Sequence, residues 1–515
     1  MADNLPIDII HSREYDRDSK DERRSIEHEP TPTAQEKLAD APPDGGYGWV
    51  CVASVFWINA HTWGINSVSI SIIIPRHCYT NVLVQSYGVF LSHYLSNDVF
   101  PNTTPLMYAF TGGLSISCAL LIAPLATYLI HLLGTRFVLN LGVFFETLSL
   151  IGASFVTQRW QLFLSQGACF GLGMGFLFVG SVGITPQWFS RRRGLAMGIN
   201  AAGSGLGGLI YSLAVGAIIP RLGLSWAFRI LGIIACAVNL VCANLLKDRN
   251  KAVGSRFKAF HLPLLKKPEF LLFLGWGVFT MLGYVAILFS IANFALSVGL
   301  SAHQSSIISA LLNLGQGLGR PFVGMFSDKL GRINVATFLT MLCGVFCLLI
   351  WIFARSMGLV TFFAILVGTV AGTYWATVAP VLAEIIDLQD LPGGLSITWL
   401  VLVPPTTVAE PIALLLRDEG SNRHVYLHVQ IFTGLMYIAA AVCLWLVRAW
   451  KVGDNVRVKQ EAAATIIATD EKKGALVQQP DGGYNASSVR RSLPPKTAIW
   501  YPHTVIRNMV KLCKV

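Results

Sequence analysis

The sequence predicts an all-α protein that crosses a membrane many times. The chain has 515 residues, of which 53% are hydrophobic and only 13% are charged. An ordinary soluble domain carries about 25% charged residues. Many apolar stretches exceed about 18 residues, the length at which a helix can cross a bilayer. These observations exclude a soluble globular protein and predict a bundle of helices embedded in lipid.

Twelve candidate membrane spans follow one another from residue 48, each close to the ~20 residues that a bilayer requires. The hydrophilic residues 247–268 follow the sixth span and divide the spans into two sets of six. The predicted spans are residues 48–67, 105–130, 136–157, 160–183, 194–217, 226–246, 269–292, 304–326, 333–355, 357–380, 394–416 and 427–449.

The predicted organisation is a six-helix half over residues 44–246, a cytosolic linker over 247–268 and a second six-helix half over 269–449. Polar tails flank this core over residues 1–43 and 450–515. The first tail holds eleven acidic and six basic residues and has no apolar segment of the kind found in secretory signals. We therefore expect it to be a disordered tail.

Loop charge predicts the orientation of the spans. If the N-terminus is inside, the inside loops hold thirteen lysines and arginines, and the outside loops hold six. Positive residues favour the cytosolic side, so both tails are predicted to be cytosolic. The sequon at Asn102 would then face outward and the sequon at Asn485 inward. The net charge of +11 follows this loop pattern, which indicates membrane orientation and not nucleic-acid binding.

Cofactor chemistry and enzymatic catalysis are not expected. The ten cysteines lie mostly within apolar runs and form no CxxC pair or cysteine–histidine pattern, so no metal site is predicted. No set of nucleophile and base is recognisable, and no phosphate-binding loop is present in the sequence.

Glycines cluster inside three of the predicted spans. Small residues at such spacing let helix backbones approach closely. The pattern indicates either static close packing or two bundles that rock against each other, as in alternating-access carriers. The glycines are Gly167, Gly171, Gly173 and Gly175 in the fourth span, Gly203, Gly205, Gly207 and Gly208 in the fifth, and Gly315, Gly317 and Gly319 in the eighth.

Three motifs resemble those of a known family. Residues 43–49 (PDGGYGW) open the first span, residues 188–198 (WFSRRRGLAMG) open the fifth, and residues 324–332 (GMFSDKLGR) join the eighth and ninth. The first two resemble signatures of the monocarboxylate-transporter family, a branch of the major facilitator superfamily. The third is similar to the GxxSDxxGR loop of that superfamily. The resemblance covers residues 43–449, looks like the fungal permeases of this branch, and implies the major facilitator fold with a substrate site between its two halves.

The motif residues are candidates for gating. Asp44 precedes a helix start and serves either as an ordinary cap or in a conformational role. In the family, Arg191 and Arg192 belong to a stretch that helps to form the inner gate; the alternative is a loop anchored to lipid phosphates. Asp328 and Arg332 are expected to form charge contacts between helices that break as the carrier opens inward, and the alternative is a solvated turn.

The resemblance also indicates a substrate site. Arg320 matches the arginine of the eighth span that meets the substrate carboxylate in related carriers, but its usual acidic partner is replaced by Gln316. The family's first-span lysine is replaced by Asn66 and Ser67, and Tyr87 is a further candidate. An arginine fork suits a carboxylate, so a small organic anion is predicted, with structural pairing of Arg320 as the alternative. The less cationic pocket also admits a neutral or larger solute, such as the flavins that one fungal branch carries.

Other polar and aromatic residues within the spans have weaker assignments. Glu146 in the third span and Glu410 in the eleventh are candidates for proton coupling, because ionisable residues at membrane depth are usually functional. We expect His61 to be a hydrogen-bonded core residue, Trp399 to pack and Glu384 to be solvated. The fifth span lacks the proline of the superfamily's antiporter motif, which favours symport or facilitated diffusion.

Residues 68–85 are anomalous. They interrupt a stretch that is continuous in the related family, and Pro75 and Arg76 at membrane depth would break a helix. Our hypothesis is a retained intron, since the eighteen-residue segment keeps the reading frame; the alternative is an extracellular hairpin. A spliced transcript without these residues would support the hypothesis, and their uniform presence in mature messenger RNA would contradict it.

The sequence therefore predicts a secondary transporter of the plasma membrane, or of the vacuolar membrane as the alternative. Its substrate is predicted to be a small organic anion, with a proton as a candidate second ion, moved by alternating access. An alternative of another class is a nutrient sensor that does not transport and signals through its tails. The remaining alternative is an inactive product of the 68–85 insertion.

Overall fold

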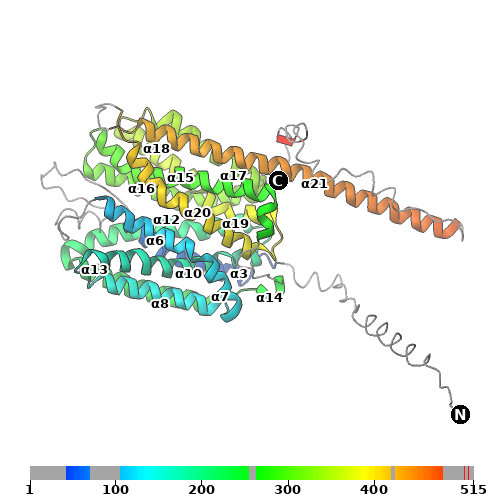
Figure 1. Ribbon diagram of the computed structural model, residues 1–515, viewed down its shortest axis with the longest axis horizontal. Helices are drawn as coiled ribbons and strands as arrows, with labels where there is room; N and C mark the ends of the chain where they lie inside the picture. The colour runs from blue at the N-terminus through cyan, green and yellow to red at the C-terminus, as the bar shows by residue number, and fades with distance from the viewer. Residues whose placement is uncertain are drawn as a thin grey trace, which may run out of the picture. The chain divides into compact units, whose positions relative to one another are not determined.

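The described part of the chain is a bundle of helices (Figure 1), and it contains no β-strand. Residues Pro43–Val515 belong to one compact unit. The all-α class predicted from the sequence is confirmed. The computed structural model describes residues 42–69, 105–254, 262–418, 424–478, 504 and 508–509.

Helices occupy all six predicted spans of the first half. The first span is interrupted at Thr62, and the second is bent by 42° at a break. The fourth span contains a π-helical turn. The helices are α3 (Gly48–His61), α4 (Trp63–Ser69), α6 (Pro105–Leu121), α7 (Ala123–Leu133), α8 (Thr135–Ala153), α9 (Arg159–Leu162), η1 (Phe163–Cys169), α10 (Phe170–Val182), α11 (Thr185–Trp188), α12 (Arg193–Leu222) and α13 (Leu224–Leu245).

The second half supplies the other six spans. Two short helices, α14 (Asn250–Val253) and η2 (Leu262–Lys266), lie in the predicted linker. The last helix continues beyond residue 449, where its predicted span ends, into the predicted tail. The helices of this half are α15 (Pro268–Ser297), α16 (Ala302–Leu330), α17 (Arg332–Phe346), η3 (Cys347–Trp351), α18 (Met357–Ala371), α19 (Thr373–Ile385), α20 (Leu391–Leu415) and α21 (Leu427–Gln478).

Two of the spans depart from simple apolar helices. Within the described residues, nine helical segments are long and apolar enough to cross a membrane, and the bent pair α6–α7 makes a tenth. The pair α3–α4 is divided into two short helices. α16 is less apolar because it carries polar residues that are buried in the bundle, namely Ser305, Ser306, Ser309, Asn313, Gln316 and Arg320.

The two halves meet where α12 lies against α16. A methyl group added to Gly205 of α12 would lie 2.6 Å from the backbone nitrogen of Gly317 on α16. A methyl group added to Gly317 would lie 2.8 Å from Cγ of Leu206. These glycines therefore allow the two helix backbones to touch. The close packing that the sequence predicted is present at this contact.

We expect Gly205→Ala to lower the unfolding temperature of the purified protein. The added methyl group meets backbone atoms that cannot rotate away, and overpacking of this kind costs about 1–3 kcal/mol. Gly113→Ala on α6 is the matched control, because its methyl group would meet no described atom within 4 Å. Alanine is also the better helix former by about 1 kcal/mol. Equal unfolding temperatures for the two variants would contradict the prediction.

Candidate functional site

A cavity lies between the two halves. Its volume is about 110 Å³, and a cavity of about 10–15 Å³ on the same scale holds one water molecule. The cavity can therefore admit a small solute. Its walls are mainly apolar. The polar residues that line it are Asn59, Asn66, Asn200, Ser204, Tyr284, Ser309, Asn313, Gln316, Arg320 and Thr406.

Arg320 of α16 is the central polar residue of this cavity, and it is 2% exposed. One terminal nitrogen donates to the carbonyl oxygen of Ala201, at 2.6 Å, and to the hydroxyl of Ser204. The other donates to Oε1 of Gln316 at 2.6 Å and to the Tyr284 hydroxyl at 3.2 Å. Since Ala201 and Ser204 belong to α12, the guanidinium joins the two halves.

The charge of Arg320 is held by neutral groups. Gln316 occupies the position where related carriers place an acid, and among the described residues no carboxylate forms an ion pair with Arg320. Of the described residues that line the cavity, Arg320 alone is charged. A buried cation without a counter-charge is costly in a low-dielectric interior. The site therefore favours a ligand that carries a negative charge.

The other predicted substrate contacts are only partly described. Asn66 is buried, lines the cavity, and accepts a hydrogen bond from the Ser115 hydroxyl at 2.8 Å through Oδ1. Ser67 lies in α4, but its side chain is outside the described residues. Tyr87 and residues 70–85 of the anomalous segment also lie outside them.

The two candidate proton-coupling residues do not line the cavity as the described residues define it. Glu146 is 1% exposed on α8, and its Oε2 accepts a hydrogen bond of 2.6 Å from the Asn239 amide of α13. Glu410 is buried on α20. Each carboxyl is therefore buried within the bundle, and neither belongs to the described lining of the cavity that holds Arg320.

Aromatic residues from both halves pack beside the cavity. Trp63 of α4 and Trp375 of α19 both line it, and their ring centroids are 5.1 Å apart. Trp399 is fully buried and stacks on Trp375 with a centroid distance of 6.0 Å, in agreement with its expected packing role. His61 lies on α3, and its Nδ1 is 2.7 Å from the carbonyl oxygen of Trp57, as expected for a hydrogen-bonded core histidine.

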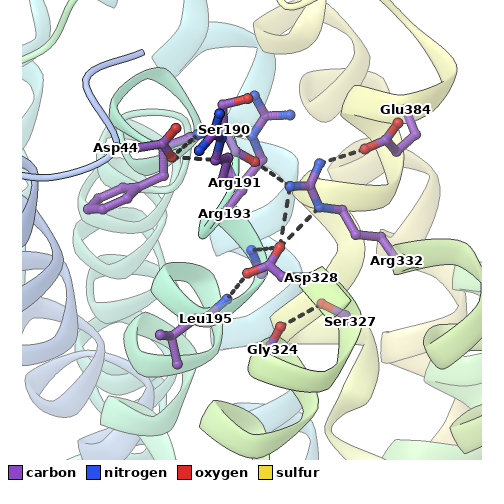
Figure 2. A network of polar contacts seen from close by, with 12 residues as sticks. Asp44, Ser190, Arg191, Arg193, Leu195, Gly324, Ser327, Asp328, Arg332 and Glu384 are labelled. Atoms are coloured by element: carbon purple, nitrogen blue, oxygen red, sulfur yellow. Dashed lines mark hydrogen bonds and ion pairs between the residues drawn. The ribbon is translucent and has the colours of Figure 1, made fainter. Parts of the chain in front are cut away.

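Figure 2 shows a network of polar contacts at the end of the bundle where α12 begins and α16 ends. The carboxylate of Asp328 accepts backbone hydrogen bonds of 2.9 Å from Gly194 and Leu195. These N–H groups belong to the first turn of α12, where they have no partner within the helix and where the helix dipole favours a negative charge. Asp328 therefore caps a helix of the opposite half.

Arg332 extends this network. Gly331 has φ 103°, a conformation that favours glycine, and its turn places Arg332 at the start of α17 beside Asp328. The guanidinium contacts Oδ1 of Asp328 at 3.3 Å and donates to the carbonyl oxygen of Ser190 at 2.5 Å. It also pairs with Oε1 of Glu384 at 2.5 Å. Glu384 keeps 33% of its side chain exposed, in agreement with the expected contact with solvent, but its pairing with Arg332 was not predicted and arises because α17 and α19 bring the two side chains together.

Asp44 and the arginine run lie in the same region (Figure 2). Oδ1 of Asp44 accepts hydrogen bonds from the backbone N–H groups of Ser190, at 2.7 Å, and Arg191, at 2.8 Å. The Asp44 carboxylate thus caps the loop before α12. Arg191 and Arg192 have exposed side chains, whereas Arg193 is buried and donates to the Phe189 carbonyl oxygen at 3.0 Å.

Several cavity residues were not singled out from the sequence. Ser204 and Tyr284 contact Arg320 from α12 and α15. Ser309 and Asn313 share α16 with Arg320 and lie at intervals of four and seven residues that place them on one face of the helix. This spacing of polar residues within an apolar span was the available signal.

Comparison with known proteins supports a transport role. Residues 52–296 match the family described as the Major Facilitator Superfamily. "Probable transporter MCH2" of Saccharomyces cerevisiae is 33% identical over 82% of this chain and 87% of its own. "Fujikurins efflux protein" of Gibberella fujikuroi is 25% identical over 70% of this chain and 77% of its own.

A solved structure of the major facilitator proton:xylose symporter XylE bound to 6-bromo-6-deoxy-D-glucose has the same fold. It superposes with a TM-score of 0.62 at 12% identity and covers 78% of this chain and 95% of its own. At this identity the likeness concerns the fold alone.

Proposed function

This chain belongs to the major facilitator superfamily and is a secondary transporter, not an enzyme, and we propose that it carries a small organic anion of the monocarboxylate class. The observation that carries the proposal is Arg320, a buried cation at a cavity between the halves whose described partners are all neutral. A carboxylate ligand would supply the missing negative charge and match the guanidinium fork. The motifs at residues 43–49 and 188–198 support the monocarboxylate-transporter branch.

Transport would proceed by alternating access. The proposed gate consists of Asp44, Arg191, Arg192, Asp328 and Arg332, at the predicted cytosolic end of the bundle. Asp328 and Arg332 contact residues of the opposite half, so their bonds must break for the halves to separate at this end. We propose that the protein resides in the plasma membrane, or in the vacuolar membrane as the alternative. In either membrane, the proposed orientation places both tails in the cytosol.

A proton is the proposed second ion, with Glu410 and Glu146 as its candidate carriers. Both are carboxyl groups buried within the bundle, and ionisable residues at membrane depth commonly serve proton relays. Symport predicts that uptake of the anion rises when the outside medium is acidified. If the anion moves by facilitated diffusion, acidification should raise uptake only by the amount of undissociated acid that enters the cells passively.

The first experiment measures uptake of labelled lactate, pyruvate, acetate and riboflavin into cells that lack their own transporters. The full-length chain is compared with a chain without residues 68–85 and with cells carrying an empty vector. Saturable uptake of at least one carboxylate supports the proposal. Uptake of riboflavin alone would overturn the proposal that the substrate is an anion. If both chains are well expressed and neither takes up any of the four compounds, none of them is the substrate.

A larger or neutral solute is the second candidate. The mainly apolar walls, with Trp63, Phe178 and Trp375 among the lining residues, favour it. The first span offers Asn66 and Ser67 in place of a cation. Riboflavin in the uptake panel tests this candidate directly.

A further inference from the structure

The polar lining of α16 extends well beyond Arg320. Ser309, Asn313, Gln316 and Arg320 line the cavity and follow one another at steps of four, three and four residues. These steps place the four side chains along one face of the helix. With a rise of 1.5 Å per residue, Asn313 lies about 10 Å from Arg320 along the helix axis.

The two ends of this face differ in their hydrogen bonds. Gln316 and Arg320 bond to each other and to Tyr284. In contrast, Nδ2 of Asn313 and Oγ of Ser309 have no hydrogen-bond partner among the described residues. Both residues are also buried, since Asn313 is 5% exposed and Ser309 is 2% exposed. A buried polar group without a hydrogen-bond partner destabilises the folded protein. Such a cost is relieved if a ligand supplies the partner.

We propose that the substrate is an elongated monoacid whose carboxylate meets Arg320 and whose second, uncharged oxygen group meets Asn313 and Ser309. This inference rests on the proposed anion function and narrows its substrate class to hydroxy or oxo acids of medium chain length. The amide of Asn313 and the hydroxyl of Ser309 can each donate a hydrogen bond to such an oxygen.

The walls of the cavity exclude a second charge at the far end. Leu288 and Phe289 of α15 also line the cavity, as does Leu312, which precedes Asn313 on α16. Arg320 is the one charged side chain among the described lining residues. A dicarboxylate would place its second charge among apolar groups without a cation, which is costly. The middle of the substrate is therefore apolar and its far end neutral.

The test measures binding to the purified full-length protein by ligand-induced thermal stabilisation, because a ligand that binds the native state raises its unfolding temperature. The probes are 8-hydroxyoctanoate, octanoate and the dicarboxylate suberate. We expect 8-hydroxyoctanoate to bind about tenfold more tightly than octanoate, and suberate to bind more weakly than either. Hydroxyoctanoate binding no better than octanoate, or suberate binding best, would overturn the inference.

Asn313→Leu assigns the effect to this residue. The variant is expected to lose the tenfold preference for the hydroxy acid while it still binds octanoate like the wild type, which also shows that it is folded. Asn293→Leu on α15 is the control, since Asn293 is not among the lining residues and bonds to its own helix, and it should keep the preference. Equal weakening of both acids by Asn313→Leu would contradict the assignment.

A failure of the underlying anion function has a different signature. If no acid of any kind stabilises the wild-type protein, the anion proposal falls and this inference falls with it. If octanoate binds and Arg320→Gln removes that binding, but the distal hydroxyl has no effect, only the inference about the second oxygen group is overturned.

Discussion

Arg320→Gln is expected to reduce carboxylate uptake by at least about a hundredfold. Removal of one partner of a buried, hydrogen-bonded charge pair commonly costs 2–5 kcal/mol, and about 2.7 kcal/mol corresponds to two orders of magnitude in affinity. Glutamine keeps a polar side chain but removes the charge that would pair with the substrate. The measurement compares the initial rates at which the variant and the wild-type protein take up a labelled carboxylate that the wild type carries.

Arg320→Lys separates charge from geometry. Lysine retains a positive charge but lacks the planar fork that binds a carboxylate through two parallel hydrogen bonds. It also cannot reproduce the four contacts that Arg320 makes with Ala201, Ser204, Tyr284 and Gln316. We expect an intermediate loss of about tenfold.

The control for both variants is Arg355→Gln. Arg355 precedes α18, is exposed and contacts His424, away from the cavity lining, so its loss should leave uptake within about twofold of wild type.

Arg320→Gln also removes a buried charge that has no described counter-ion, so we expect no large fall in the unfolding temperature. Wild-type uptake by Arg320→Gln would contradict the assignment of Arg320.

Asp328→Ala is expected to open the predicted cytosolic end of the bundle. The substitution removes two charge-assisted hydrogen bonds to the first turn of α12 and two hydrogen bonds from Arg332. A helix cap is worth about 1 kcal/mol, and hydrogen bonds to charged groups about 1.5–3 kcal/mol each. A loss of 2 kcal/mol would shift the balance between closed and open states about thirtyfold.

The measurement is the rate at which a membrane-impermeant thiol reagent labels Met197→Cys from the cytosolic side, in a background without native cysteines. Met197 lines the cavity and is 2% exposed, so its labelling requires opening. Arg332→Gln should also speed labelling, but less, because Asp328 keeps its bonds to α12. Lys451→Gln is the control, since the ion pair of Lys451 within the described residues is with Asp454, its neighbour on the same helix.

An unchanged labelling rate in Asp328→Ala would show that these contacts do not hold the gate. Slower labelling would contradict the direction of the prediction. Uptake measured on the same variant should fall by about tenfold, because a carrier biased toward one side returns slowly to the other.

The location of the helices could be predicted from the sequence because the physics is local. In a bilayer every backbone N–H and C=O must be bonded within its own helix, so each span needs about 20 apolar residues in sequence. The predicted third span, residues 136–157, corresponds to α8 (Thr135–Ala153). Even α16, with Arg320 in its middle, was located as the predicted span 304–326, although the polar face that Ser309 and Asn313 share with Arg320 was not recognised.

The partners of the functional side chains depend on the tertiary structure. Resemblance pointed to Arg320, but Ser204 and Tyr284 reach it from helices more than 30 residues away in the sequence. The ion pair between Glu384 and Arg332 was not predicted, because nothing in the local sequence indicates that α19 lies beside the start of α17. Asp328 caps α12, more than 130 residues away, only because glycines allow α12 and α16 to touch.

The sequence by itself therefore determined the membrane class, the twelve spans and the residue types available for an anion site. The tertiary structure decided which of those residues face one cavity and which contact each other across the two halves. The physical reason is that spans follow from a run of neighbouring residues and the thickness of the bilayer. A binding site instead depends on the packing of helices that are distant in the sequence, and packing is set by side-chain shape at each contact.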